Sequence, residues 1–346
     1  MRPKEYSLLF TVLLFVSSVI AQDKSSETVS RYEVSYENQY YTLGRIESNK
    51  SKGFNYCYYL RIPKAANIMN KNYLLVCTTA TGKPNDDINY HDSRVKNACK
   101  NSWESQIASK LGVPLLMPVF ERSRSNSQYY THVLDRDVML IKKGKNDKAR
   151  LDLQLLAMIS DAQDLLYQKG IITEKKIILA GFSASGYFAN RFTFMHPDIV
   201  KAVATGGIGG MPMLPLSIFE KKKLLYPIGV YDIKKITGED LNEDEYEMIP
   251  QLIFMGELDT NDMFQISGNP EDQCVYQVNN QFGKEVSNRW EKTRKILEGT
   301  ACNIQTITYI GVEHTVNPGI IDDIVSFFKI NCGEKYEPLI PSIPYR

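Results

Sequence analysis

The sequence predicts an α/β protein with a mostly parallel central sheet, helices on both faces of that sheet and an antiparallel extension on its N-terminal side. From residue 73 onward, short β-branched or leucine-rich runs alternate with amphipathic helical stretches, which is typical of parallel sheets. Before them, alternating and aromatic runs at residues 31–36 and 56–60 favour antiparallel strands. A chain of 346 residues, 43% apolar and 23% charged, fits one large globular domain.

Six short apolar runs are the predicted parallel strands. One helix is especially clear, because apolar residues recur at helical spacing over residues 151–168, so that one face packs on the sheet and the other meets water. The predicted strands cover residues 73–78, 114–119, 176–180, 202–205, 251–255 and 305–310.

The N-terminus has the pattern of a secretory signal peptide. Basic residues at 1–4 precede an apolar stretch at 7–20, which ends in small residues before a cleavage point after Ala21. An uncleaved membrane anchor is the alternative, but the run is shorter than the roughly 20 residues that span a bilayer. We therefore expect a secreted or extracytoplasmic protein without a stable membrane anchor.

The remaining chain divides into three parts. Residues 22–72 supply the N-terminal strands, residues 73–332 form the catalytic domain, and residues 333–346 are a C-terminal tail. A long connection at about 206–250 is expected to be a lid or a wall of the substrate pocket, since long loops in compact domains are often functional. The alternative is a surface excursion away from the site.

Charge and cysteine content narrow the partners and the compartment. The 41 basic and 40 acidic residues nearly cancel, so no summed field favours nucleic acid or another polyanion. Export would place the six cysteines in an oxidising compartment. Cys302 precedes the last predicted strand and Cys332 ends the helix that returns antiparallel to it, so a Cys302–Cys332 disulfide is expected.

The strongest chemical motif is the run Gly181-Phe182-Ser183-Ala184-Ser185-Gly186. It joins a predicted strand to a predicted helix at 187–195 and puts Ser183 at the apex of a sharp turn, which requires small residues two positions before and after the serine. Gly181 and Ser185 meet that requirement, although Ser185 replaces the usual glycine. Ser183 is therefore the candidate nucleophile, and a simple helix N-cap is the alternative.

Stabilisation of a negatively charged intermediate needs backbone donors near Ser183. The N–H of Ala184, at the start of the helix, is one expected oxyanion donor. The second should lie in the loop after the first parallel strand, at Thr79 or Ala80.

A serine hydroxyl is a poor nucleophile without a base, and the chain has four histidines. His314 follows the last predicted strand and is the candidate base. His196 ends the helix after Ser183 and is expected to be a cap, while His91 is placed in a polar loop and is expected to be solvated. His132 has a predicted structural or surface role, with a place in the pocket wall as the alternative.

The orienting carboxylate is expected in the run Gly256-Glu257-Leu258-Asp259-Thr260-Asn261-Asp262, which follows the apolar strand at 251–255. Asp259 is favoured because its place on the loop turns it back toward the histidine. Asp262 and Glu257 are the alternatives. The chain order Ser183, Asp259, His314 is that of α/β-hydrolases and differs from the orders in chymotrypsin and subtilisin.

With these motifs in place, the chain from about residue 73 to 328 resembles bacterial-type α/β-hydrolases of the esterase and polyhydroxybutyrate-depolymerase-like group. The matching pieces are the serine run, Met195-His196-Pro197, the run 256–262 and Gly311-Val312-Glu313-His314. The resemblance implies that Ser183, Asp259 and His314 hydrolyse a small or polymeric carboxylic ester through an acyl-enzyme, without a cofactor. The alternatives are a serine peptidase acting on short peptides and a non-catalytic binding protein.

Metal and nucleotide chemistry are not indicated by the sequence. No cluster of Cys or His has the spacing of a metal site, and no glycine loop of the phosphate-binding type occurs. The run Gly206-Gly207-Ile208-Gly209-Gly210 follows a predicted strand, and we interpret it as allowing close approach of the backbone to the pocket.

Overall fold

The structure is a computed structural model that describes residues 32–64, 72–80, 83–142, 144–263 and 273–333. The predicted signal peptide and nearly all of the predicted C-terminal tail lie outside the described residues. Among the described helices, none is both long enough and apolar enough to cross a bilayer.

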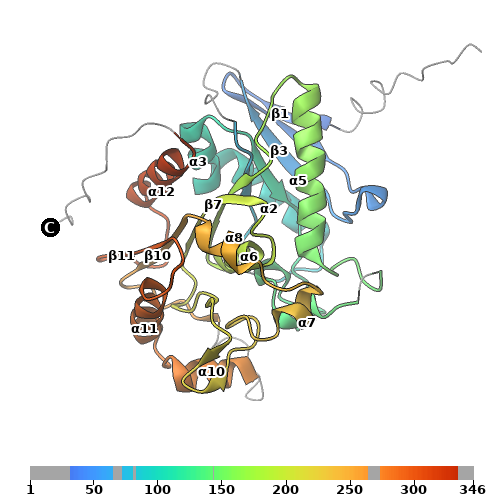
Figure 1. Ribbon diagram of the computed structural model, residues 1–346. Helices are drawn as coiled ribbons and strands as arrows, with labels where there is room; N and C mark the ends of the chain where they lie inside the picture. Colours follow the sequence, from blue (N-terminus) through green and yellow to red (C-terminus); the bar gives the residue numbers. More distant parts are fainter. Residues whose placement is uncertain (1–31, 65–71, 81–82, 143, 264–272, 334–346) are drawn as a thin grey trace, which may run out of the picture.

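A nine-stranded sheet forms the centre of the molecule, with the strand order β1-β2-β3-β5-β4-β6-β7-β10-β11 (Figure 1). The six strands from β5 to β11 in this order are parallel, and β1, β2 and β3 extend the sheet in antiparallel fashion. The predicted fold class is thereby confirmed. The strands are β1 (Tyr32–Glu37), β2 (Tyr41–Ile46), β3 (Tyr58–Pro63), β4 (Leu75–Cys77), β5 (Leu115–Pro118), β6 (Ile177–Phe182), β7 (Val200–Gly206), β10 (Gln251–Gly256) and β11 (Ile304–Tyr309).

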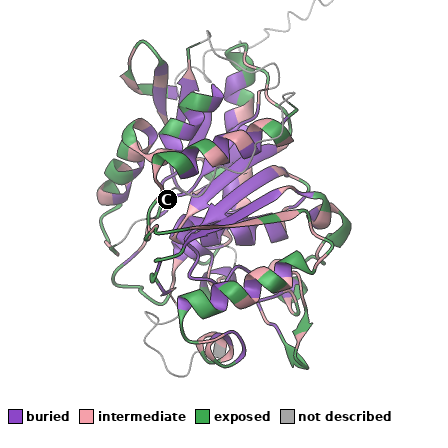
Figure 2. Ribbon diagram, turned by 90° about the vertical axis from the view of Figure 1, so that its left-hand side faces the viewer, coloured by how far each residue is buried: buried purple, intermediate pink, exposed green. Residues whose placement is uncertain are grey.

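Helices cover both faces of the sheet because its side chains alternate between two apolar cores. Leu179 faces α5 (Leu151–Gln168) and α6 (Ala184–Met195), whereas its neighbour Ile178 faces the core shared with α12 (Pro318–Asn331). Figure 2 shows the buried strands between helices whose outer sides are exposed. The other helices are α2 (Ile88–Asn101), α3 (Trp103–Leu111), α4 (Arg136–Met139), α7 (Ile233–Thr237), α8 (Glu243–Met248), α10 (Gln273–Gln281) and α11 (Val286–Glu298), with 3₁₀ turns η1 (Lys50–Lys52) and η3 (Thr131–Val133).

The long connection at 206–250 contains the small hairpin of β8 (Ile218–Phe219) and β9 (Lys222–Lys223), followed by α7 and α8. Its residues Leu214, Leu224 and Ile228 share an apolar core with Ala184 and Tyr187 at the start of α6. The connection therefore packs beside the helix that follows the serine turn.

The expected Cys302–Cys332 disulfide is wrong. Cys302 packs against the core on the α5 and α6 side of the sheet, whereas Cys332 is buried in the core on the α12 side. A disulfide needs Cα atoms within about 7 Å, and here the sheet stands between the two residues. The pairing is prevented because α12 covers the face of the sheet opposite to the turn before β11.

Glu104, on α3, is a buried carboxyl group that makes folding stability depend on pH. Burial raises its pKa to about 7, while a hydrogen bond donated by the Ser102 hydroxyl lowers it. Because the folded protein holds this proton to a higher pH than the unfolded chain, the stability that it contributes falls as pH rises from about 4.5 to 7.

We expect Glu104→Gln to remove this dependence. The free energy of unfolding of the variant should equal that of the wild type near pH 5 and exceed it at pH 8. The difference between the two proteins should grow by about 2 to 3 kcal/mol between these pH values. Urea unfolding at the two pH values measures it, with Glu33→Gln on the exposed surface of β1 as the matched control. An equal change in both variants would contradict the assignment to Glu104.

Candidate active site

Ser183 occupies a strained turn between β6 and α6. Its backbone has φ of 59° and ψ of −127°, a combination that non-glycine residues rarely adopt. The Ser183 N–H donates to the Gly206 carbonyl of β7 at 2.9 Å, and the Ser183 carbonyl accepts from the Tyr187 N–H at 3.1 Å. The turn thus fixes a half-buried serine at the carboxyl end of the sheet, where α/β proteins place ligands.

Small residues around Ser183 make the turn sterically possible. A Cβ atom at Gly181 would collide with the Ser185 carbonyl, and one at Gly186 would approach the Gly206 carbonyl to 2.7 Å. Ser185 fits in the usual glycine position and adds two hydrogen bonds, since its hydroxyl donates to the Phe182 carbonyl at 2.8 Å and accepts from the Phe182 N–H at 2.9 Å. The Ser185 side chain therefore closes the turn on itself.

Asp259 and His314 come together at the same edge of the sheet. Asp259 is buried, and its Oδ2 lies 2.8 Å from His314 Nδ1, while its Oδ1 accepts from the Asn261 N–H at 2.9 Å. Both carboxylate oxygens therefore have donors. A carboxylate in this position orients the imidazole so that Nδ1 carries the proton and Nε2 is an acceptor.

Backbone pairing beyond β10 and β11 sets this geometry. Gly256 and Tyr309 are opposite each other in the parallel register of β10 and β11. The two loops that follow these strands are also joined by backbone hydrogen bonds. The Glu257 N–H donates to the Tyr309 carbonyl and the Leu258 N–H donates to the Val312 carbonyl, both at 2.9 Å. A Cβ at Gly256 would meet the Val312 carbonyl, so the close approach requires glycine. The two loops thereby carry Asp259 and His314 to adjacent positions.

The two alternative carboxylates have other partners. Asp262 forms a buried, bidentate ion pair with Arg289 of α11, in which Arg289 Nη1 lies 3.0 Å from Asp262 Oδ1. Glu257 is exposed and accepts a hydrogen bond from the Gly311 N–H at 2.9 Å. Among the described carboxylates of this loop, Asp259 alone contacts His314.

The second ring nitrogen of His314 is occupied by a residue that sequence reasoning missed. Asn261 Nδ2 lies 2.7 Å from His314 Nε2, and the ring of Phe182 packs 4.6 Å from the His314 ring centroid. Within the described part of the chain, no hydrogen bond joins Ser183 Oγ to His314. Its place two residues after Asp259 could have identified Asn261, because an aspartate carboxylate commonly accepts from the N–H two residues on, as it does here.

The other three histidines lie in different surroundings. His196 caps the end of α6 and bonds to Asp152 at 3.0 Å, in line with the expected cap. His132 is buried, its Nε2 bonds to the Phe120 carbonyl at 2.9 Å, and burial lowers its pKa to about 3. The expectation that His91 lies in a solvated loop is wrong: Asp87 caps α2, which contains His91, and the helix buries this residue beneath the loop at Asn85.

The predicted oxyanion donors lie on two neighbouring elements. Ala184 is the first residue of α6, and Thr79 and Ala80 follow β4, whose Cys77 pairs with Ala180 of β6. Beside them, sequence reasoning missed Thr78, whose Oγ1 is buried and has no hydrogen-bond partner among the described residues. The end of β4 thus offers a buried hydroxyl and backbone N–H groups next to the serine turn.

Comparison with solved structures identifies the fold as that of α/β-hydrolases. LpqC, a poly(3-hydroxybutyrate) depolymerase from Bordetella parapertussis, superimposes with a TM-score of 0.51 at 14% identity, over 88% of this chain and 91% of LpqC. Poly(aspartic acid) hydrolase-1 from Sphingomonas sp. KT-1 gives a TM-score of 0.50 at 16% identity, over 79% of this chain and 94% of that one. No protein-family model matches the sequence, and no curated protein matches it either.

Proposed function

We propose that this α/β-hydrolase-fold protein is a serine hydrolase that cleaves carboxylic esters with Ser183 as nucleophile, His314 as base and Asp259 as the orienting acid. The observation that carries the proposal is a strained serine at the carboxyl edge of a parallel sheet that also presents a bonded Asp259–His314 pair. A strained backbone conformation costs stability, so a positive φ at a non-glycine residue is retained where the function requires it. The two structural neighbours named as a depolymerase and a hydrolase are compatible with this reaction class.

In the proposed reaction, Ser183 Oγ attacks the ester carbonyl while His314 Nε2 takes its proton. Asp259 holds the imidazole with Nδ1 protonated and stabilises the imidazolium that forms. The protonated His314 then gives its proton to the leaving alcohol, and an acyl group remains on Ser183. Water, activated by His314, attacks this acyl-enzyme and releases the carboxylic acid and free Ser183.

Asn261 has to leave His314 Nε2 before the base can act, because a lone pair that accepts from an amide N–H cannot also take a proton from Ser183. The Asn261 side chain is exposed, so its rotation away from the ring disturbs no apolar core. The hydrogen bond of 2.7 Å therefore defines a resting arrangement, and the reactive one follows when Ser183 or the substrate takes the place of Asn261.

Developing charge on the carbonyl oxygen needs donors that are fixed in advance. The N–H of Ala184 at the start of α6 is the first proposed donor, and the N–H of Thr79 or Ala80 is the second. The substrate class is a small or polymeric carboxylic ester, and we propose that the protein is exported through its N-terminal signal peptide and acts outside the cytoplasm.

A fluorophosphonate probe tests the proposed function, since it phosphorylates activated serines. We expect the purified wild-type chain to be labelled on the peptide that contains Ser183, as identified by mass spectrometry. The variant Ser183→Ala should lose labelling completely, whereas Ser217→Ala, at an exposed serine of the 206–250 connection, should label like the wild type. Circular dichroism checks that each variant is folded.

Substrate panels separate the competing functions. Turnover across a chain-length series of p-nitrophenyl esters supports an esterase, and turnover confined to aminoacyl amides would make the protein a peptidase. A folded wild type that neither labels nor hydrolyses either class would instead be a binding protein. Labelling that persists in Ser183→Ala would overturn the assignment of the nucleophile.

A further inference from the structure

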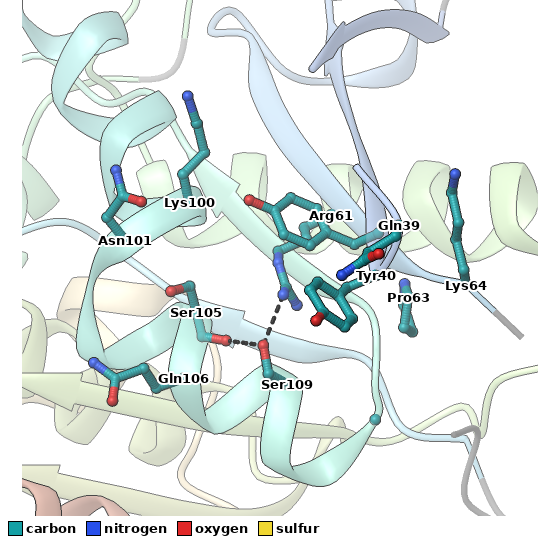
Figure 3. Close-up of a pocket in the computed structure, with 12 residues that line it drawn as sticks. Gln39, Tyr40, Arg61, Pro63, Lys64, Lys100, Asn101, Ser105, Gln106 and Ser109 are labelled. Carbon is teal, nitrogen blue, oxygen red and sulfur yellow. Dashed lines mark hydrogen bonds between the residues drawn. The ribbon is translucent and has the colours of Figure 1, made fainter. Parts of the chain in front are cut away.

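Figure 3 shows a cavity lined by residues that take no part in the serine turn. Its walls come from the turn between β1 and β2, the end of β3 and the helices α2 and α3. Arg61 of β3 is opposite Leu115, the first residue of β5, so the cavity lies at the amino end of the parallel strands, whereas Ser183 lies at their carboxyl end. Its volume of about 710 Å³ falls within the range of small-molecule sites.

Arg61 is the unusual residue of this cavity. The residue is only 4% exposed, its Cζ stacks 3.8 Å from the centre of the Tyr41 ring, and its Nη2 donates to Ser109 Oγ at 2.7 Å. The Ser109 hydroxyl in turn donates to the Ser105 carbonyl at 2.8 Å, which fixes its orientation. Figure 3 shows the Arg61 side chain pointing toward Ser109 of α3, with their hydrogen bond dashed.

Two of the three guanidinium nitrogens of Arg61 remain without a partner. Nε and Nη1 are buried and make no hydrogen bond to any described residue, and no described carboxylate forms an ion pair with Arg61. Burying a charge without a counter-charge costs several kcal/mol, and unmet N–H donors add to this cost. Burial accordingly lowers the pKa of Arg61.

Two other arginines show the counter-charge that Arg61 lacks among the described residues. The buried Arg289 has the carboxylate of Asp262, and the partly buried Arg150 has that of Asp152 at 2.8 Å. At the Arg61 cavity the charged neighbours are mostly cations: Lys100 lies with its Nζ 4.1 Å from the Tyr36 ring centre, and Lys64 at the rim pairs with the exposed Glu37 at 2.5 Å. The charged side chains that line the cavity therefore give it a positive charge, and the Nε and Nη1 donors of Arg61 lack a hydrogen-bond acceptor among the described residues.

We propose that this cavity is an anion-binding site that takes the carboxylate or phosphate group of a small organic molecule. The guanidinium group of Arg61 donates to the oxyanion, because its planar fork matches the oxygens of either group. Lys100 adds positive charge, and Tyr40, Tyr41 and Pro63 provide apolar wall for the carbon skeleton. This site is separate from the proposed active site and does not depend on the proposed ester hydrolysis.

The test uses the purified full chain with sodium phosphate or sodium benzoate, each compared with sodium chloride at equal ionic strength and pH. We expect one of the two oxyanions to raise the melting temperature with a saturable dose response, because a ligand that binds only the folded state stabilises it. Saturation by benzoate alone identifies a carboxylate site, and saturation by phosphate alone identifies a phosphate site. Responses to both that equal the response to chloride would overturn the proposal.

Variants assign the binding to Arg61. Isothermal titration with the active anion should show affinity at least tenfold weaker in Arg61→Met, since loss of a charge-assisted pair costs at least 1.4 kcal/mol. Arg124→Met removes one exposed positive charge and should bind like the wild type. If Arg61→Met does not fold, Arg61→Lys keeps the charge without the planar fork and should bind more weakly than the wild type.

Ser183→Ala separates this site from the proposed active site. The variant should bind the anion with wild-type affinity, whatever the outcome for ester hydrolysis. Loss of binding in Ser183→Ala, or unchanged binding in both Arg61 variants, would place the anion elsewhere and overturn the proposal.

Discussion

Replacing His314 by alanine is expected to lower kcat by roughly 10⁴- to 10⁶-fold, the range over which loss of a triad base acts in serine hydrolases. Without the imidazole, Ser183 has no group to accept its proton and the leaving alcohol has no acid. Substrate binding does not depend on the base, so KM should change far less than kcat. The measurement is steady-state hydrolysis of the p-nitrophenyl ester that the wild type turns over fastest.

Two matched variants control for general effects of losing a histidine. His196→Gln breaks the contact with Asp152 at the end of α6, and His132→Gln changes a buried histidine bonded to the Phe120 carbonyl. Both should lower stability and leave the kcat of the folded fraction within about tenfold of the wild type. The role of His314 is refuted if its alanine variant keeps more than a tenth of wild-type activity while a control variant does not.

Asp259→Asn is expected to lower kcat by about 10⁴-fold with little change in structure. An asparagine amide at this position can donate to Nδ1, which moves the imidazole proton to Nε2 and leaves no lone pair facing Ser183. The buried position of Asp259 and its distance of 2.8 Å to His314 Nδ1 make this tautomer effect direct. Steady-state kinetics on the same ester gives the loss.

The two neighbouring carboxylates provide the controls for Asp259. Asp262→Asn breaks the buried pair with Arg289 and should cost about 3 to 5 kcal/mol in the free energy of unfolding. Glu257→Gln, at an exposed side chain, should change stability by less than about 0.5 kcal/mol. A larger loss of kcat in either control than in Asp259→Asn would move the acid to that residue.

Local sequence patterns predicted the limits of helices and strands well, because the apolar spacing within a single element is enough to identify it. The helix predicted at 151–168 has the same limits as α5, because its apolar spacing depends on a single helical face. The six parallel strands begin and end within about two residues of their predicted positions, since buried runs between turn residues mark them. The antiparallel extension was likewise predicted, from alternating and aromatic runs of residues.

Contacts between distant segments were harder to predict. His91 lies in a polar run, yet Asp87 caps a helix there and the fold then buries one side of it. The Cys302–Cys332 pairing failed because a sequence does not state which face of the sheet a returning helix covers. No function was predicted for Arg61 from the sequence, because its cavity forms only where β2, β3 and α3 come together in the fold.

The serine turn has a consequence for the way in which such proteins are detected by letter patterns. The usual pattern demands glycine two positions after the nucleophile, and this chain has Ser185 there, bonded to Phe182 through its hydroxyl. The need for a missing Cβ instead falls on Gly186, against the carbonyl of Gly206. A sequence motif that requires a small residue two positions after the serine and glycine three positions after it would find proteins such as this one. The usual motif, which requires glycine at the first of these positions, excludes them.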